Sequence, residues 1–191
     1  MICTECNKIF RKENLIKKDN GEYRCPIYGC NHFLIEVDDS LMEIVRLFNE
    51  LNVRTMFCCS GHFHSDTFRC QMMFVQVKDE VDKQLYNVDL YKLHDICEEL
   101  SKHKDYKDVV KISKISELRL PLSNDPDFSL QHERFSIESI FEDEKDLQER
   151  FFIQYRFLNF LTTLIYRIHE IYEAITEEET MTEIHSKRNI Q

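Results

Sequence analysis

The sequence has little glycine, no tryptophan and no long apolar run. It contains three glycines in 191 residues, where the usual share of about 7% would give roughly a dozen. No stretch approaches the ~18 uninterrupted apolar residues of a membrane span, and the opening MICTECNKIF lacks the apolar segment of a secretory signal. We therefore expect a cytoplasmic protein with no membrane partner.

Positive charge is also scarce. The chain holds 25 Lys and Arg against 35 Asp and Glu, for a net charge of −10, and such a surface repels a phosphate backbone. Residues 1–34 hold six basic and four acidic side chains, a charge of +2, so the remaining residues carry −12. Contact with nucleic acid is therefore expected only through residues 1–34.

Four of the eight cysteines are closely spaced near the N-terminus. Cys3, Cys6, Cys25 and Cys30 form C-x2-C and C-x4-C pairs separated by eighteen residues, a spacing typical of one tetrahedral Zn²⁺ site. Asn20-Gly21 predicts a hairpin turn, with short strands expected at 8–10 and 22–24. These features predict a zinc ribbon over residues 1–34, with His32 as the alternative to Cys30 as fourth ligand.

The remaining chain predicts an α+β domain over residues 35–176, in which helices pack on a small, mostly antiparallel sheet. Ser40 and Glu43 form a capping-box pattern at the start of a helix over 40–51, and Asp89 is the expected cap of a second helix over 89–103. Strands are expected at 53–57, 70–77, 109–115, 117–122 and 134–141. A polar, frayed tail is expected over 177–191.

The longest helical signal runs over residues 143–176. Its apolar residues keep a helical period, and Phe152, Phe157, Phe160, Leu161 and Leu164 widen the apolar face. One interpretation is a helix buried across the sheet. The other is a face that packs against a protein partner or a second copy of the chain.

The segment CCSGH, Cys58–His62, contains the one glycine outside the ribbon and predicts a tight turn. It has four interpretations. Cys59, His62, His64 and Cys70 are candidate ligands of a second metal. Either Cys58 or Cys59 is a candidate nucleophile, with His62 as its base. The turn is alternatively a cradle for an anion, with His62 as an added donor, or a simple turn in which the cysteines are small buried hydrophobes.

The order of a zinc ribbon, a capped helix, NELNVRT and CCSGH resembles uncharacterised proteins of phages and low-GC Gram-positive bacteria over residues 1 to about 78. A more distant similarity is to the tRNA-wybutosine methyltransferase family, in which a strand runs into a T-x-x-S-C-S-G-R-like loop. That similarity implies a ligand site lined by Thr55, Cys59, Ser60, Gly61 and His62, where His62 replaces the family's basic residue.

Together these observations lead to one main expectation and two alternatives. The main expectation is a zinc-binding, phage- or mobile-element-encoded protein that binds a protein partner and modulates a host nucleic-acid or defence complex. The first alternative is an enzyme with its site at CCSGH, either an RNA-modifying methyltransferase or a hydrolase. The second is an acidic inhibitor that mimics DNA.

Overall fold

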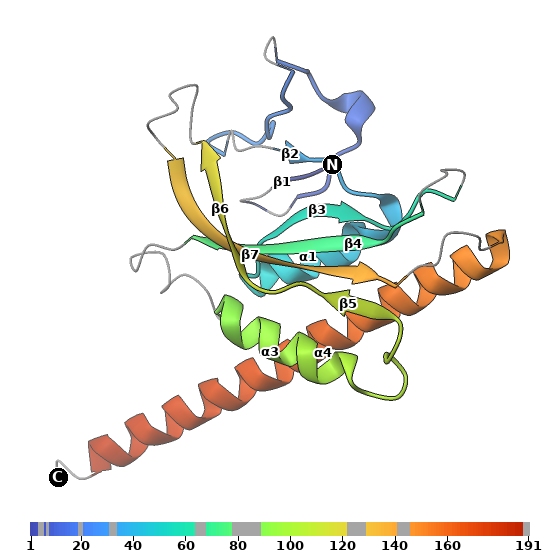
Figure 1. The fold of residues 1–191 in the computed structure, drawn as a ribbon. Helices are drawn as coiled ribbons and strands as arrows, with labels where there is room; N and C mark the ends of the chain where they lie inside the picture. The colour runs from blue at the N-terminus through green and yellow to red at the C-terminus, as the bar shows by residue number, and fades with distance from the viewer. Residues whose placement is uncertain are drawn as a thin grey trace.

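The protein is an α+β fold built on one antiparallel sheet, as the sequence predicts (Figure 1). The computed structural model describes residues 1–3, 6, 8–18, 21–30, 34–63, 68–77, 89–121, 129–140 and 146–188. The main sheet consists of β3 (Thr55–Cys59), β4 (Gln71–Val77), β5 (Val110–Ile112), β6 (Ser116–Pro121) and β7 (Ser129–Ser139). All five strands were expected close to these positions.

The long strand β7 organises the sheet. Along one edge it pairs with β4, with Met72 opposite Ile137 and Phe74 opposite Phe135. Along its other edge it pairs first with β6 and then with β5. β3 pairs with β4 on the far side, so it is the edge strand of the path β3-β4-β7-β5. Every pairing is antiparallel.

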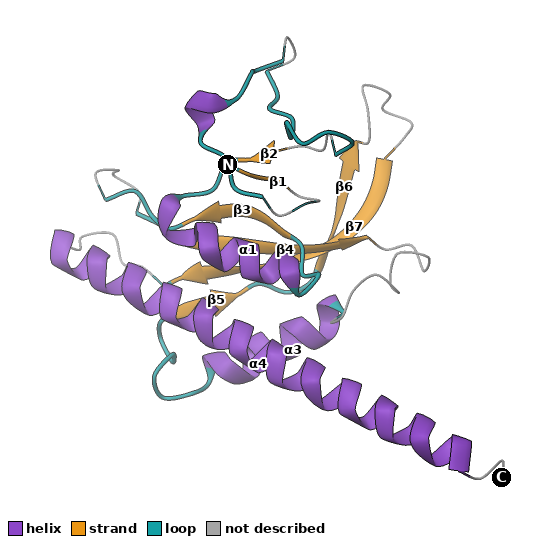
Figure 2. Ribbon diagram, turned by 180° about the vertical axis from the view of Figure 1, so that it is seen from behind, coloured by secondary structure: helices purple, strands orange, loops and turns teal. Residues whose placement is uncertain are grey.

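Three helices cover one face of this sheet (Figure 2). They are α1 (Met42–Glu50), α3 (Leu90–Ser101) and α4 (Leu147–Arg188). Alternate strand residues such as Phe74, Phe135 and Ile137 enter the core between the sheet and the helices, where Phe48 meets the Phe74 ring edge-on at 5.1 Å. α4 lies across the helical layer and then extends past the body (Figure 2).

Buried residues of α4 confirm that its middle packs into the core. They are Phe157, Phe160, Leu161, Leu164, Ile165 and Ile168. The helix runs on to Arg188, although a frayed tail was expected after residue 176. No glycine or proline follows Pro126, and the Glu-rich segment after residue 176 has good helix propensity, so nothing in the sequence ends the helix at 176.

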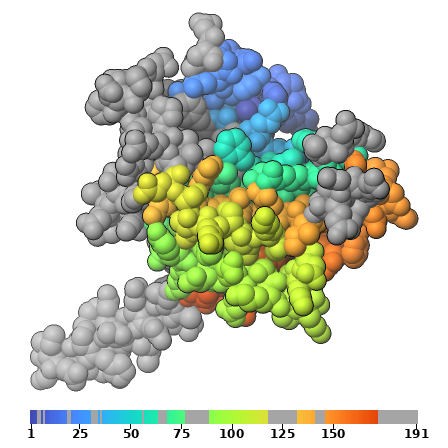
Figure 3. All heavy atoms as spheres, viewed as in Figure 1, coloured from blue at the N-terminus to red at the C-terminus, as the bar shows by residue number. Residues whose placement is uncertain are grey.

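The N-terminal residues form a lobe at one end of the molecule (Figure 3). β1 (Ile2–Cys3) pairs with β2 (Leu34–Ile35), and Lys17 bridges to Tyr23 across a turn that contains Gly21. Met1, Cys3, Cys25 and Leu34 form a small core inside the lobe, whereas Ile2 is buried in the main core. Alternation along β1 therefore directs Ile2 into the main core and Cys3 into the lobe.

Two local predictions are wrong. The short strands expected at 8–10 and 22–24 do not form, because these segments contain only isolated bridges such as Ile9 to Ile2 and Tyr23 to Lys17. The capping box is also absent: a 3-10 turn, η2 (Asp39–Leu41), precedes α1, whose N-cap is Leu41 with no side-chain cap. A second 3-10 turn, η1 (Lys12–Asn14), lies in the N-terminal lobe. The other expected cap is confirmed, since the Asp89 carboxylate accepts a hydrogen bond from the Lys92 N–H at 2.8 Å.

Candidate functional site

The four N-terminal thiols converge on one point. The Sγ atoms of Cys3, Cys6, Cys25 and Cys30 all lie within 4.8 Å of one another. Sγ of Cys3 is 3.6 Å from Sγ of Cys30, and Sγ of Cys6 is 3.6 Å from Sγ of Cys25. These separations exclude disulfides, whose S–S bond is ~2.0 Å. They match the edge of about 3.8 Å expected for a tetrahedron with metal–sulfur bonds of ~2.3 Å.

Local backbone structure places these thiols. The Cys3 N–H donates to the Lys8 carbonyl at 3.0 Å and the Cys30 N–H donates to the Ile27 carbonyl at 3.1 Å, so each pair lies on a tight turn. Gly29, with φ of +82°, gives the longer C-x4-C turn the left-handed residue it needs. The group can hold a metal ion through four sulfur ligands. His32, the alternative ligand, lies outside the described residues.

The CCSGH segment begins in a distorted part of the edge strand. β3 pairs Met56 with Met73 but Cys59 with Gln71, so β3 has one more residue than β4 between these pairs. Such a bulge bends a strand and reorients its side chains. Phe57 has a left-handed φ of 49°. Cys58 packs against the main core, while Cys59 joins a different group.

That group is Asp38, Cys59 and His62, whose ligand atoms lie within 4.8 Å of one another. Asp38 precedes the helical residues of η2 and α1, and the other two residues end β3 and follow it. The Asp38 carboxylate does not cap its own helix. Its Oδ2 accepts hydrogen bonds from the Ser60 backbone N–H at 2.8 Å and the Ser60 hydroxyl at 3.1 Å, which fixes the loop against the start of the helical layer.

The side chain of Cys70, which directly precedes β4, and side chains from α4 also hold this loop. The Ser60 carbonyl accepts hydrogen bonds from the Cys70 thiol and from Nε2 of Gln154, both at 2.9 Å. One turn earlier on α4, Nη1 of Arg150 donates to the Phe63 carbonyl at 2.7 Å. The loop is thus fixed by segments from three distant parts of the sequence.

Gly61 is required in this loop for two reasons. Its φ of +95° is a left-handed conformation that residues with a side chain rarely adopt. A Cβ at this position would lie 2.5 Å from Cε2 of Phe68 and 2.7 Å from its Cζ. Phe68 is buried, and Phe63 packs on its ring at 5.5 Å. The expectation that glycine is needed at this position is confirmed, whereas Ser60 to His62 are irregular backbone and no tight turn is assigned to them.

Burial disfavours the thiolate form of the cysteines around the loop. Burial raises the pKa of Cys58 to about 11 and that of Cys70 to about 12. The pKa of Cys59 is also raised, first by burial and then by the negative charge of Asp38. A cysteine nucleophile is activated by a lowered pKa, so this arrangement does not favour Cys59 as a free nucleophile.

The structure brings together only part of the second metal site proposed from the sequence. Cys59 and His62 are neighbours, as expected. Cys70 is fully buried, with its thiol directed at the Ser60 carbonyl, and His64 lies outside the described residues. Asp38, Arg150 and Gln154 were not anticipated. The sequence carried no distinct signal for the last two, because several other polar residues lie in the same stretch of the helix.

A row of large side chains on the first turns of α4 is exposed. Leu147, Phe151, Phe152 and Tyr155, here called the exposed row, are 58–64% accessible. Phe151 stacks on Phe63 at 5.8 Å, which joins the row to the CCSGH loop. The sequence had placed these residues on the same apolar face as the residues now found in the core.

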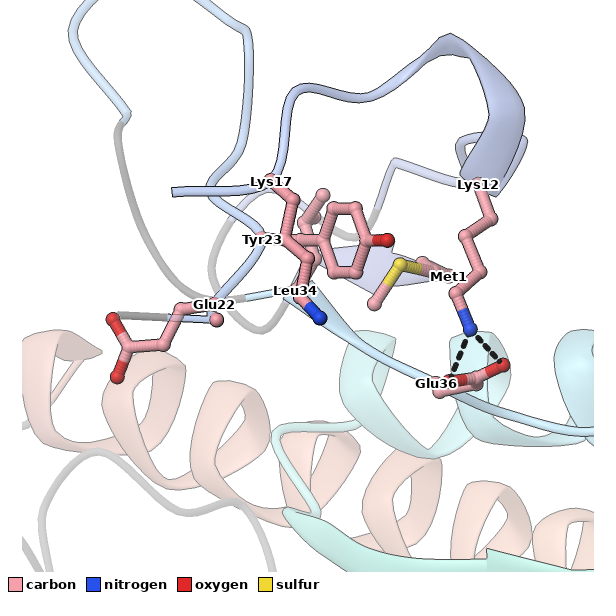
Figure 4. Close-up of a pocket in the computed structure, with 8 residues that line it drawn as sticks. Met1, Lys12, Lys17, Glu22, Tyr23, Leu34 and Glu36 are labelled. Carbon is pink, nitrogen blue, oxygen red and sulfur yellow. Dashed lines mark hydrogen bonds and ion pairs between the residues drawn. The ribbon is translucent and has the colours of Figure 1, made fainter. Parts of the chain in front are cut away.

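The N-terminal lobe also contains a cleft of about 440 Å³, lined in part by Met1, Lys12, Tyr23 and Glu36 (Figure 4). Nζ of Lys12 lies 2.8 and 2.9 Å from the two carboxylate oxygens of Glu36. A phosphate group bound in this cleft would have to compete with Glu36 for Lys12. The positive charge of the lobe is therefore partly neutralised where a ligand would enter.

Comparisons with protein-family models, curated proteins and solved structures found no significant match to this chain. Within the part of the chain that the structure describes, no helix has both the length and the apolarity needed to cross a bilayer. The function is therefore inferred from the site geometry.

Proposed function

We propose that this is a zinc-binding protein that acts by binding a protein partner through the exposed row of α4. The observation that carries the proposal is the row itself. Four large apolar side chains are more than half accessible on one end of a helix whose middle is already committed to the core. Aromatic side chains and arginines dominate the energetics of protein interfaces, and Arg156 lies over the ring of Phe152 at 5.5 Å.

The metal in this proposal is a structural Zn²⁺ held by Cys3, Cys6, Cys25 and Cys30. The near-tetrahedral spacing of the four thiols supports it, because four protein sulfurs close the coordination shell and leave no position for chemistry. The lobe's core consists mainly of the cysteines and a few apolar side chains. Binding of the metal would therefore supply much of the folding free energy of this lobe.

The partner surface is tested by affinity capture from lysates of a low-GC Gram-positive bacterium, with tagged wild-type protein and a Phe151→Ser, Tyr155→Ser variant. Both side chains are largely exposed, so the variant should fold normally. Interface residues of this kind contribute ~2 kcal/mol or more each, so captured partners should fall at least tenfold. The matched control is Tyr28→Ser in the N-terminal lobe, where the ring is fully exposed.

Three results would contradict this surface. Equal capture by the α4 variant and wild type would remove the row as the binding site. Loss of capture only in Tyr28→Ser would move the partner to the N-terminal lobe. A wild-type dimer in sedimentation analysis that becomes a monomer in the α4 variant would show that a second copy of the chain covers the row.

A second candidate function is an enzyme with its site at the CCSGH loop, such as an RNA-modifying methyltransferase or a hydrolase. It is supported by the convergence of Asp38, Cys59 and His62. Calorimetric binding of S-adenosylmethionine or a nucleotide to wild type, lost in Cys59→Ala and His62→Ala, would favour it. No binding to any of the three proteins would count against it.

A further inference from the structure

We propose that Asp38, Cys59 and His62 form a second metal site that takes a borderline divalent cation such as Zn²⁺ and leaves one coordination position open. The three ligand atoms already lie within 4.8 Å of one another. Metal–ligand bonds of 2.0–2.3 Å place neighbouring ligands of a tetrahedral ion roughly 3.3–3.8 Å apart. His62 is exposed, so its side chain is not held in place by core packing. The proposal is independent of the partner surface on α4.

The donor set selects the class of metal. A thiolate, an imidazole and a carboxylate together suit Zn²⁺ and related first-row ions, whereas Ca²⁺ and Mg²⁺ prefer oxygen ligands alone. With one thiolate and one carboxylate, the two negative charges balance the charge of a divalent cation. Three protein ligands with a fourth position for water or substrate are typical of catalytic zinc sites, unlike the four thiols of the N-terminal lobe.

The carboxylate has the support expected of a ligand. Both hydrogen bonds from Ser60 reach Oδ2 of Asp38, and they orient the carboxylate without using all its lone pairs. Groups behind a metal ligand that fix its orientation in this way raise metal affinity. Because Ser60 lies between Cys59 and Gly61, the same bonds also fix the backbone that carries the other two ligands.

Several side chains from outside the CCSGH loop donate hydrogen bonds to its backbone carbonyls. Gln154 and Cys70 both donate to the Ser60 carbonyl, and Arg150 donates to the Phe63 carbonyl. Gly61 leaves no room for a side chain because of Phe68. The side chains of Cys70 and of α4 thus fix the backbone on both sides of His62, and this is the preorganisation that a functional site requires.

The open coordination position faces solvent. Asp38 and Cys59 are partly buried, and His62 is exposed, so a cation between them is accessible from the His62 side. A bound water there would have a lowered pKa, and a small anion or thiol could replace it. His64 lies outside the described residues, and the proposal does not depend on it.

The test is the metal content of the full chain after equilibrium dialysis against Zn²⁺, for wild type, His62→Ala and the control His103→Ala. Both histidines are exposed, so neither change disturbs the core, and His103 lies in the loop after α3. We expect two equivalents of zinc for wild type and His103→Ala and one for His62→Ala. Bound zinc should also slow the alkylation of Cys59 by at least tenfold in wild type but not in His62→Ala.

Equal zinc content in wild type and His62→Ala, whether one equivalent or two, would overturn the second site. The alkylation rate of Cys59 is also measured without metal. If it is fast in wild type and slower in His62→Ala, then His62 activates Cys59 as a base activates a nucleophile, and the metal proposal fails. Failure of the N-terminal zinc gives a different result, because His62→Ala would then hold no zinc while wild type and His103→Ala hold one equivalent. Circular dichroism of each variant confirms that the fold is intact.

Discussion

Replacing Gly61 by alanine perturbs the CCSGH loop at its most constrained point. The added Cβ would lie 2.5 Å from a ring carbon of the buried Phe68, so the ring or the loop must move. The left-handed backbone costs about 1 kcal/mol for a residue with a Cβ, and overpacking in a core costs about 1–3 kcal/mol. We expect a total loss of roughly 2–4 kcal/mol in the free energy of unfolding.

A double-mutant cycle separates the two contributions. In a Phe68→Leu background the ring is absent, so Gly61→Ala should cost only the backbone contribution of about 1 kcal/mol, and the coupling energy should be about 1–3 kcal/mol. Gly21→Ala is the matched control, because it has a φ of +87° but an added Cβ would meet no atom closer than 3.8 Å. The assay is urea denaturation followed by circular dichroism.

Equal costs for Gly61→Ala in the two backgrounds would refute the argument, since the clash with Phe68 would then have no energetic consequence. A cost no larger than that of Gly21→Ala would lead to the same conclusion. A coupling energy in the expected range would establish that the loop geometry is fixed by packing as well as by hydrogen bonds.

Three further predictions follow from the structure. Asp38→Ala should lower the free energy of unfolding by about 1–3 kcal/mol in urea denaturation, because the buried Ser60 N–H and hydroxyl lose their acceptor. A change below about 0.5 kcal/mol would contradict this. Burial raises the pKa of Cys97, so its thiol stabilises the fold fully below the unfolded-state pKa of ~8.5 and loses that contribution as pH rises. The stability of wild type relative to Cys97→Ala should therefore fall above that pH by up to ~1.4 kcal/mol per unit, and a constant difference would refute it. Removal of zinc by a chelator should abolish hydrogen-exchange protection in residues 1–34, while β4 and β7 keep theirs. Equal loss of protection in residues 1–34 and in the two strands would contradict the idea that the metal stabilises the N-terminal lobe alone.

Much of the fold follows from local sequence signals. Short apolar runs locate the strands, and the Asp89 cap and the helical period of the apolar residues in α3 and α4 locate the helices. The thiol group was also predictable, because closely spaced cysteine pairs converge in space through short turns and do not depend on distant packing. The direction of Cys59 was not predictable, since it depends on a bulge that breaks the alternation of β3.

The rest of the CCSGH site could not be predicted because its parts are far apart in the chain. Asp38 lies just before the first helical residues, where an acidic side chain needs no further explanation. Its carboxylate instead accepts a hydrogen bond from Ser60, a residue 22 positions away. Arg150 and Gln154 reach the loop across 87 and 94 positions, and only the packing of α4 determines that contact. Similarly, helical periodicity indicated that α4 has a broad apolar face but not that its first turns extend beyond the core.

The central claim is that Cys3, Cys6, Cys25 and Cys30 together hold one zinc ion. X-ray absorption at the zinc edge of the His62→Ala variant tests this directly, because that variant should hold zinc only in the N-terminal lobe. The account predicts a shell of four sulfur atoms at about 2.3 Å. A nitrogen in the shell would contradict the four-cysteine assignment and would indicate a histidine such as His32 as the fourth ligand. A protein that is purified without zinc and binds none on dialysis would contradict the claim altogether.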